Sequence, residues 1–300
     1  MKKWQHYPHS PWEFHEDVVA SKQDRNLDKT VAQTFNDMIY QAFLEYEDNF
    51  YSDSLGLIQP RNFTPVEELK KSDGSLLSET EIKRSLHDLY DYDSFPFAIL
   101  KYFLTTTEDN QIITTCPICT CEKIGSLDHI IPRQAMVEFS TNPLNLIPSC
   151  TKCNGKKSTN WKENNVYKYI NPYLDDLSDK EYLRVMIIWI DDKPVCDFET
   201  YQGNGISDSL YAQIHNHFHD LELCTRFREA ASEALGSIAN SIQSESGTIY
   251  SRRASLLREG RKQLIQEGQS YWLGLLKIKC ASDRRLFEYL LTYKPSNRYP

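Results

Sequence analysis

The sequence predicts an α+β chain that is mostly helical, with a small cysteine-framed module near its middle and a β-hairpin after that module. Three observations support this fold class: helical periodicity in the first 110 residues, five cysteines between residues 116 and 153, and a strand–turn–strand pattern around residue 190. We therefore expect a helical N-terminal domain over residues 1–110, the central module over 111–170, and a hairpin plus helical C-terminal domain over 171–300.

In the N-terminal part, apolar residues in steps of three and four predict an amphipathic helix over residues 27–50. The sequence Thr-Pro-Val-Glu at 64–67 is typical of a helix start, with an N-cap followed by proline. Ser-Glu-Thr-Glu predicts the start of another helix at 78–90, and an apolar run follows at 95–104. Core packing explains these apolar stripes, and we expect a small helical domain.

The C-terminal part combines a hairpin with long helices. Residues 182–190 and 195–200 are rich in β-branched and aromatic side chains and predict two strands joined by a turn at 191–194. A long helix is predicted from residue 208 past 235. The basic stretch 252–262 is also helical in pattern, and it suits an auxiliary nucleic-acid contact or a solvated face equally well.

Three histidines lie within the helix predicted from residue 208. His215 and His219 share one face, four residues apart, and this spacing is compatible with metal binding. His217 lies on another face, and the sequence offers no third ligand nearby. Exposed histidines, or histidines with partners in the fold, are the simpler interpretation.

Composition and charge restrict the classes of protein considered. The 300 residues are 40% hydrophobic and 25% charged, which is typical of globular proteins. The longest apolar run, residues 185–190, is far shorter than the ~20 residues of a membrane helix. No apolar secretory signal follows the first residues. We expect a cytoplasmic protein without a membrane partner.

The net charge of −8 is unevenly distributed. Residues 1–110 carry 11 Lys/Arg and 20 Asp/Glu, whereas residues 116–162 carry six and three, and residues 251–285 carry nine and three. An acidic front half argues against a chain-wide coat of nucleic acid. Any contact with phosphate is therefore expected to be local.

The cysteines form two C-x-x-C pairs, Cys116 with Cys119 and Cys150 with Cys153. Two such pairs supply the four thiolates of a tetrahedral structural zinc site. A disulfide framework fits poorly in a long chain without a secretory signal, and a redox motif needs only one pair. Cys121 is left over, because its spacing from Cys119 is too tight. The isolated cysteines are interpreted as small buried apolar residues: Cys196, Cys224 and Cys280.

Polar residues suited to catalysis lie between and just after these pairs. Asp128 and His129 are adjacent on a short extended segment, which places their side chains on opposite sides of the backbone. One side chain can bind a cation while the other faces a reacting water. Asn154 can offer an amide oxygen to the same cation, and the lysine pair Lys156 and Lys157 is placed to meet phosphate.

The combined pattern resembles the HNH endonuclease family with its zinc-binding frame. The elements that carry the resemblance occupy about 45 residues, and they are Cys116-x2-Cys119, Asp128-His129-Ile130-Ile131-Pro132, Asn145-Leu146 and Cys150-x2-Cys153-Asn154-x2-Lys157. The resemblance implies a ββα-metal finger: a hairpin bearing the Asp-His pair, then a helix that returns the last ligand.

The resemblance also implies roles for these residues. His129 would be the general base, and Asp128 and Asn154 would bind one divalent ion, Mg²⁺ or Mn²⁺. Asn145 would hold the loop that orients His129. Arg133, together with the lysine pair, would contact phosphate. The third letter of the motif is Asn154 rather than His, which favours a hard, oxygen-preferring ion, and the glycine pair often seen in the family is replaced by residues 134–141.

A weaker resemblance concerns residues 171–176, Asn-Pro-Tyr-Leu-Asp-Asp, followed by the hairpin and long helix. This arrangement is similar to HNH nucleases of bacterial defence systems, such as the nuclease partner of the Septu and retron-linked ATPases. The resemblance implies an anti-phage effector controlled by a partner protein. The acidic front half would then be a natural docking surface.

Three functions remain in competition at this point. The first is a metal-dependent phosphodiesterase that cleaves DNA, and the second is an HNH enzyme that cleaves RNA, including tRNA. The third is a zinc module that binds nucleic acid or protein without catalysis. The set Asp128, His129 and Asn154 argues against the third, because a binding module needs no base beside a cation ligand.

Overall fold

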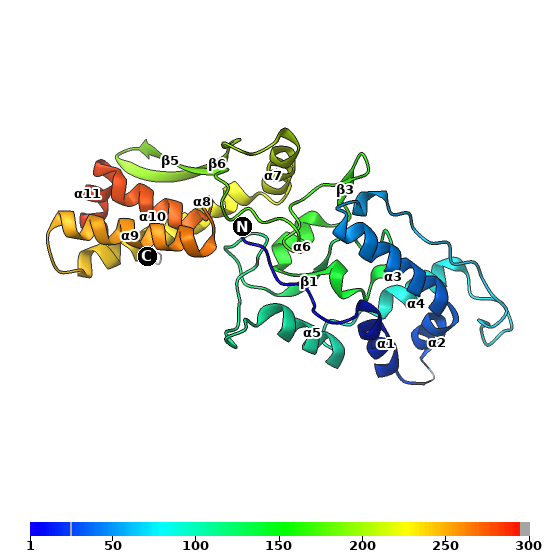
Figure 1. Ribbon diagram of the computed structural model, residues 1–300. Helices are drawn as coiled ribbons and strands as arrows, with labels where there is room; N and C mark the ends of the chain where they lie inside the picture. The colour runs from blue at the N-terminus through cyan, green and yellow to red at the C-terminus, as the bar shows by residue number, and fades with distance from the viewer. Residues whose placement is uncertain (25, 295–300) are drawn as a thin grey trace. The chain divides into compact units, whose positions relative to one another are not determined.

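The computed structural model describes residues 1–24 and 26–294, and the chain divides into two compact units (Figure 1). One unit comprises residues 4–118 and 122–174. The other comprises residues 175–300 with the short segments 1–3 and 119–121. The expected N-terminal domain and central module thus lie together in the first unit. The fold mixes helices with small two-stranded sheets, in agreement with the predicted α+β class.

Helices form the N-terminal part of the first unit. In chain order they are α1 (Pro11–Ser21), α2 (Leu27–Thr34), α3 (Asn36–Tyr51), α4 (Glu79–Asp88) and α5 (Phe95–Thr105). The predicted cap of α4 is confirmed, because Ser78 and Glu81 form a reciprocal capping box. Proline occupies the first turn of both α1 and α5, where its missing N–H costs nothing.

Two helix predictions in this unit are wrong. The expected helix over 27–50 is interrupted at Phe35, whose ring is buried edge-on against Phe63 with 5.2 Å between centroids. The interruption separates α2 from α3 and lets each helix bury its own stripe. No helix starts at Thr64, because the chain forms only a turn there and then a bridge between Lys70 and Leu76.

The central module consists of a two-stranded hairpin and a short helix. Strand β1 (Ser126–His129) pairs antiparallel with β2 (Leu146–Ser149), and α6 (Thr151–Lys157) follows directly. The connection between the strands contains two short 3₁₀ turns, η2 (Val137–Phe139) and η3 (Pro143–Asn145). This is the ββα order that the sequence resemblance implies. A further 3₁₀ turn, η1 (Leu55–Leu57), precedes the module, and a minor hairpin, β3 (Lys162–Glu163) with β4 (Val166–Tyr167), completes the unit.

Buried tyrosines join the helices to the ββα module. The Tyr46 hydroxyl of α3 donates to the Asn145 side-chain oxygen at 3.1 Å, and the Tyr173 hydroxyl donates to the Leu146 carbonyl. Both tyrosines are fully buried. Helix α3 and the turn at Tyr173 are therefore both tied to the module, and the unit folds around a shared core.

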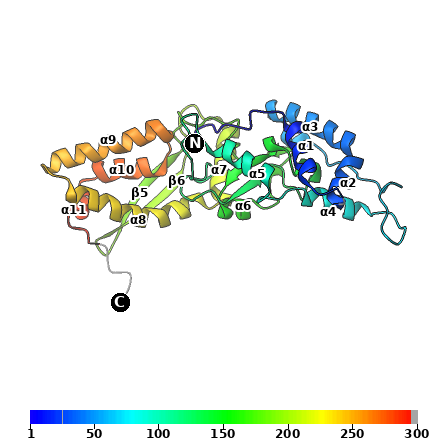
Figure 2. The ribbon, with the colours of Figure 1, turned by 90° about the horizontal axis from the view of Figure 1, so that it is seen from below.

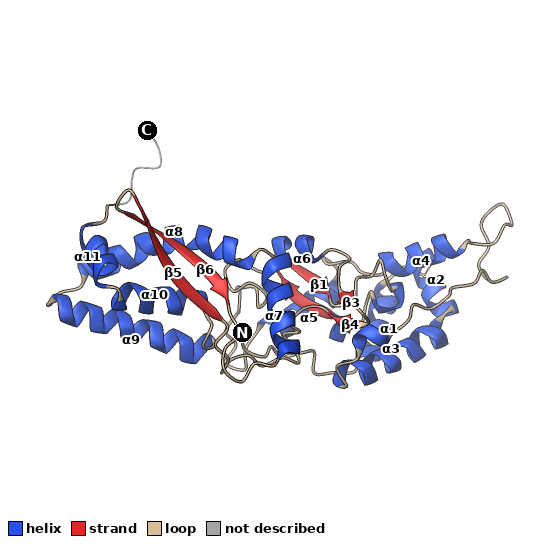
Figure 3. Ribbon diagram, turned by 90° about the horizontal axis from the view of Figure 1, so that it is seen from above, coloured by secondary structure: helices blue, strands red, loops and turns tan. Residues whose placement is uncertain are grey.

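The second unit is built on a longer hairpin, β5 (Leu183–Ile190) with β6 (Lys193–Thr200), which lies against helices (Figure 3). The hairpin prediction is confirmed, but its turn is shorter than expected. Only Asp191 and Asp192 form it, both with positive φ, as in a type I′ turn. Pro194 consequently lies on β6, opposite Trp189.

The remaining helices are α7 (Asp208–Asp220), α8 (Leu223–Ser244), α9 (Ile249–Glu267), α10 (Trp272–Ser282) and α11 (Arg284–Thr292). The expected helix running past residue 235 is wrong, because it breaks at Glu222, which has φ 52°. Leu221 and Leu223 are both buried, and two residues two positions apart cannot point to one side of a continuous helix. Among the helices of residues 1–24 and 26–294, none is both long and apolar enough to cross a membrane.

Candidate active site and metal centre

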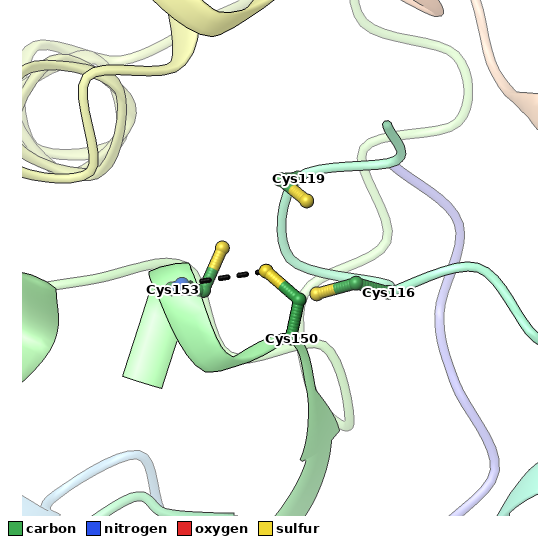
Figure 4. Close-up of side chains that lie close together, drawn as sticks. All are labelled: Cys116, Cys119, Cys150 and Cys153. Atoms are coloured by element: carbon green, nitrogen blue, oxygen red, sulfur yellow. Dashed lines mark hydrogen bonds between the residues drawn. The ribbon is translucent and has the colours of Figure 1, made fainter. Parts of the chain in front are cut away.

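Four cysteine side chains converge in the structure (Figure 4). Their sulfur atoms all lie within 4.8 Å of one another, and every one of these residues is buried: Cys116, Cys119, Cys150 and Cys153. With Zn–S bonds of about 2.3 Å, the sulfurs of a tetrahedral zinc site lie roughly 3.8 Å apart. The donor set and spacing thus fit a structural zinc ion. Cys121 stands outside the group, as the sequence spacing predicts.

The second C-x-x-C pair also shapes the helix that follows β2. Cys150 is the N-cap of α6, and its sulfur accepts a hydrogen bond from the Cys153 amide at 3.3 Å. The side chain thereby satisfies an amide at the helix N-terminus that has no intrahelical partner. The metal-binding cysteines therefore fix the position of α6, and with it the polar residues of that helix.

Strand β1 places Asp128 and His129 at the wall of a cavity of about 430 Å³. The pairing of Asp128 with Ile147 and of His129 with Leu146 fixes their register. Both side chains are nearly buried, with 5% and 7% of their surface exposed. The cavity thus gives access to two groups that otherwise lie in the protein interior.

His129 is held by the loop between the strands. Its Nε2 lies 3.0 Å from the Ser140 carbonyl oxygen, and because a carbonyl only accepts, Nε2 carries the proton and Nδ1 the lone pair. The ring also packs edge-on against Tyr90, with 4.7 Å between centroids. Burial lowers the pKa of His129 to about 3, so the imidazole is neutral near pH 7. A neutral imidazole of this tautomer keeps the lone pair on Nδ1, which is the atom that can accept a proton.

Asp128 forms a buried ion pair with Lys157. The Lys157 ammonium donates to Asp128 Oδ1 at 3.0 Å and to the His129 carbonyl at 2.5 Å. Both side chains are 6% exposed. Burial raises the pKa of Asp128, and the ammonium opposes that shift. The sequence analysis expects Lys157 to contact phosphate. In the structure the last turn of α6 directs this side chain inward, so its ammonium pairs with Asp128 instead.

Two more of the expected residues line the same cavity. Asn154, on α6, donates to the Ser126 hydroxyl at 3.3 Å. Arg133 lies at the opposite part of the wall, where its guanidinium stacks over the Tyr90 ring at 4.7 Å and donates to the His87 carbonyl at 3.2 Å. Asp128, His129, Asn154 and the guanidinium of Arg133 therefore line the same cavity. Lys156 is exposed and does not line the cavity.

Asn145 lies behind the cavity and is fully buried. Its side-chain oxygen accepts from the Ile131 amide at 2.7 Å, and its side-chain nitrogen donates to the carbonyls of Ile131 and Phe139 at 3.0 and 3.2 Å. These bonds tie together the chain on both sides of the loop that carries Ser140. Asn145 is therefore positioned to hold the loop and does not reach the cavity.

Tyr90 and Ser140 were missed by sequence reasoning. The Tyr90 hydroxyl donates to the Leu127 carbonyl at 3.1 Å while its ring contacts both His129 and Arg133. Ser140 acts through its backbone carbonyl. A tyrosine 39 residues before the histidine, and a main-chain group, leave no local signal in the sequence.

The histidines of α7 do not form a metal group of this kind. The rings of His215 and His219 stack at 5.8 Å, as expected for residues four apart on one face, and His217 is buried. Among the residues that the structure describes, only the four cysteines form a group of three or more His, Cys, Asp or Glu ligands close enough to share an ion.

Comparison with known proteins agrees with the geometry. Residues 108–160 match the family model described as HNH endonuclease, so the chain contains an HNH endonuclease domain over this segment. The matched segment contains the whole ββα module and the four clustered cysteines.

One relative extends the comparison beyond the domain. The chain is similar to Protein ea31 of Escherichia phage lambda, with 28% identity over 141 residues, which are 44% of this chain and 47% of that protein. The match thus spans about half the length of this curated relative. No solved structure matches the chain.

Proposed function

We propose that this chain is a metal-dependent endonuclease that hydrolyses phosphodiester bonds of DNA. One observation carries the proposal: Asp128, His129 and Asn154 line a single cavity beside Arg133, in a segment that matches HNH endonucleases. A base and two oxygen ligands for a cation are groups that metal-assisted phosphodiester hydrolysis uses, and a guanidinium can bind the phosphate. A module that only binds nucleic acid has no use for this combination.

The orientation of His129 supports its role as the base. Its Nε2 donates to the Ser140 carbonyl, which leaves the Nδ1 lone pair for a water proton. The water oxygen then bonds to phosphorus, the bond from phosphorus to the leaving ester oxygen breaks, and that oxygen takes a proton from solvent. Arg133 is placed to attract the phosphate group to the cavity.

The two metal roles fit different donor sets. The buried cysteines would hold a structural Zn²⁺ through four sulfurs. The carboxylate of Asp128 and the amide oxygen of Asn154 suit Mg²⁺ or Mn²⁺, hard ions that prefer oxygen ligands. Such an ion, when bound, supplies positive charge that stabilises the leaving oxygen. The protein's own contribution is to hold these oxygen donors at the wall of the cavity that His129 also lines.

A cleavage assay tests the proposal. We would compare the wild type, His129→Ala and His215→Ala on plasmid DNA and on total RNA, with Mg²⁺ or Mn²⁺. His215 is an exposed histidine outside the cavity and serves as the matched control. We expect cleavage of DNA by the wild type and by His215→Ala, and cleavage slower by about 10²- to 10⁴-fold by His129→Ala, the typical loss when a general base is removed.

Other results would change the proposal. Cleavage of RNA alone would replace DNA by RNA as the substrate. Unchanged cleavage by His129→Ala would remove this residue as the base. Absence of cleavage by all three proteins, with the zinc content intact and with the regulatory partner proposed below present, would favour the non-catalytic zinc module.

We also propose, on the resemblance of residues 171–176 and the following hairpin to defence nucleases, that the chain is an anti-phage effector with a regulatory partner such as an ATPase. The acidic first 110 residues, with 20 Asp/Glu against 11 Lys/Arg, would offer a docking surface for it. Affinity purification with the neighbouring gene products tests this role. Failure of all neighbours to co-purify would contradict it.

A further inference from the structure

Helix α9 presents a fixed face to solvent because its other side packs very closely on α10 (Figure 2). Gly260 and Gly274 meet at this contact. A Cβ atom on Gly260 would lie 2.9 Å from the Gly274 carbonyl oxygen and 2.8 Å from Ile278 Cγ1. A Cβ on Gly274 would lie 2.7 Å from Leu264 Cδ2. The two backbones approach so closely that the rotation of α9 about its axis is determined.

The solvent side of α9 is basic. Arg258, Arg261 and Lys262 are exposed, and the last two lie three and four residues after Arg258, so the three side chains share one face. Among the residues that the structure describes, no carboxylate pairs with any of these three. Tyr250 and Ile265 lie on the same face with 83% and 73% of their surface exposed.

Five other cations of the basic region 251–285 bond to groups of the protein itself. Arg253 donates to the carbonyls of Ala281 and Ser282 at the end of α10. Ion pairs occupy four more: Lys277 with Glu259, Lys279 with Asp283, Arg284 with Glu288, and Arg285 with Asp192. Arg252 is half-buried, so the exposed positive charge without a carboxylate partner in residues 251–285 is concentrated on the outer face of α9.

We propose that the outer face of α9, formed by Arg258, Arg261, Lys262 and Tyr250, binds the phosphate backbone of a nucleic acid. The inference rests on the proposed nuclease function, which requires such a partner. Exposed cations that are not neutralised by carboxylates gain most from phosphate, because contact releases the counterions of the nucleic acid. An exposed tyrosine ring adds a surface on which an unpaired base can stack.

The basic face of α9 contrasts with the negative charge of the rest of the chain. With a net charge of −8, and an acidic front half, the chain as a whole repels polyanions. A rigid basic helix supplies a local attraction that does not depend on the sequence of the nucleic acid. The face would therefore contribute affinity, while the choice of the bond to be cut stays with the HNH domain.

The test measures binding of a non-cutting protein. Two triple variants are made in the full-length His129→Ala background. One is Arg258→Gln, Arg261→Gln, Lys262→Gln. The matched control is Arg184→Gln, Arg228→Gln, Arg284→Gln, which removes the same charge from the same unit at residues paired with Glu199, Asp197 and Glu288. Loss of exposed ion pairs costs little stability, and circular dichroism verifies that both variants are folded.

Fluorescence anisotropy with labelled 30-base-pair DNA, and separately with 30-nucleotide RNA, gives Kd over a series of salt concentrations. We expect the α9 variant to lose at least tenfold in affinity for one or both ligands, with the control within threefold of its parent. The slope of log K against log salt should fall by about 2 to 3 for duplex DNA, since each phosphate contact contributes roughly 0.9.

An equal loss in both triple variants would overturn the proposal, because net charge alone would explain it. Failure of the parent to bind either ligand at low salt would overturn it as well. The proposed function fails separately, when the wild type does not cleave. Since binding is measured without cleavage, the two failures are distinguishable.

Discussion

The Lys157 ammonium lies 3.0 Å from Asp128 Oδ1 and 2.5 Å from the carbonyl oxygen of His129. This lysine, on the last turn of α6, therefore binds both residues of the Asp-His pair on β1. It joins α6 to β1 beside the cavity that Asp128 and His129 line. It also neutralises a carboxylate that is almost wholly removed from solvent.

Replacement of this lysine should destabilise the protein strongly. In Lys157→Met the Asp128 carboxylate stays buried without its cation, and loss of one partner of a buried pair costs about 3–5 kcal/mol. Urea unfolding of the zinc-loaded protein at pH 7.5 measures the free energy of unfolding. The double variant Asp128→Asn, Lys157→Met should recover at least half of the loss, because the stranded charge is gone. A single variant within about 1 kcal/mol of the wild type would contradict a buried pair.

Asn145 should matter more for stability than the hydroxyl that it binds. Asn145→Ala leaves the Ile131 amide and the Ile131 carbonyl without their partner, and each unsatisfied buried group costs about 1–3 kcal/mol. Tyr46→Phe removes one hydroxyl, which donates to the Asn145 oxygen and also lies 3.4 Å from the Leu144 carbonyl, and should cost about 1 kcal/mol. Urea unfolding compares the two variants. Equal losses would show that the asparagine network does not hold the loop as described.

The cysteine cluster should bind one zinc ion per chain. Cys150→Ala removes a sulfur ligand and the N-cap of α6, so the purified variant should lose its zinc and unfold at lower temperature. Cys121→Ala is the matched control, because this cysteine is outside the cluster. Elemental analysis by mass spectrometry measures the zinc content. Loss of zinc from Cys121→Ala, with retention in Cys150→Ala, would exclude the proposed ligand set.

The stability of the protein should fall at mildly acidic pH through His15. This histidine is 2% exposed, its Nδ1 lies 2.7 Å from the Thr141 hydroxyl, and burial lowers its pKa to about 4 from 6.5. Below pH 6.5 the unfolded chain binds the proton while the folded chain does not. The free energy of unfolding therefore decreases as pH falls from 6.5 to 4, and His15 contributes about 3 kcal/mol to this decrease.

Comparison with His15→Phe isolates this effect. The phenyl ring can keep the stack on Trp12 but does not titrate. Urea unfolding at pH 7.5 and at pH 5.0 should show a smaller pH-dependent loss in the variant than in the wild type. Identical losses would show that His15 titrates normally in the folded protein, and would assign the pH dependence to other groups.

Much of the candidate site follows from local patterns. The two C-x-x-C pairs predict the cysteine cluster because a metal ion draws its ligands from short, fixed spacings. The Asp-His pair and Asn154 lie one hairpin and one short helix apart, and the cysteines fix that arrangement. The capping box of α4 and the hairpin of β5 and β6 were likewise predictable, since both depend on residues close in sequence.

Other features depended on burial, which local patterns do not report. Helical periodicity continues through Phe35 and Glu222, but the chain breaks at both, because Phe35 packs on Phe63 and because Leu221 and Leu223 are both buried. A basic residue at the end of the motif suggests a phosphate contact. In the structure, however, Lys157 points inward from the last turn of α6 and donates to Asp128.

The sequence by itself determined the cluster of four cysteines and the order of the ββα module, because these depend on residue type and short spacing. Only the tertiary structure decided their environment: the tautomer of His129, its contact with Tyr90, and the buried partner of Asp128. Those properties arise from groups brought together across 11 to 39 residues of chain. Desolvation then sets their charge, and desolvation exists only once the chain has packed.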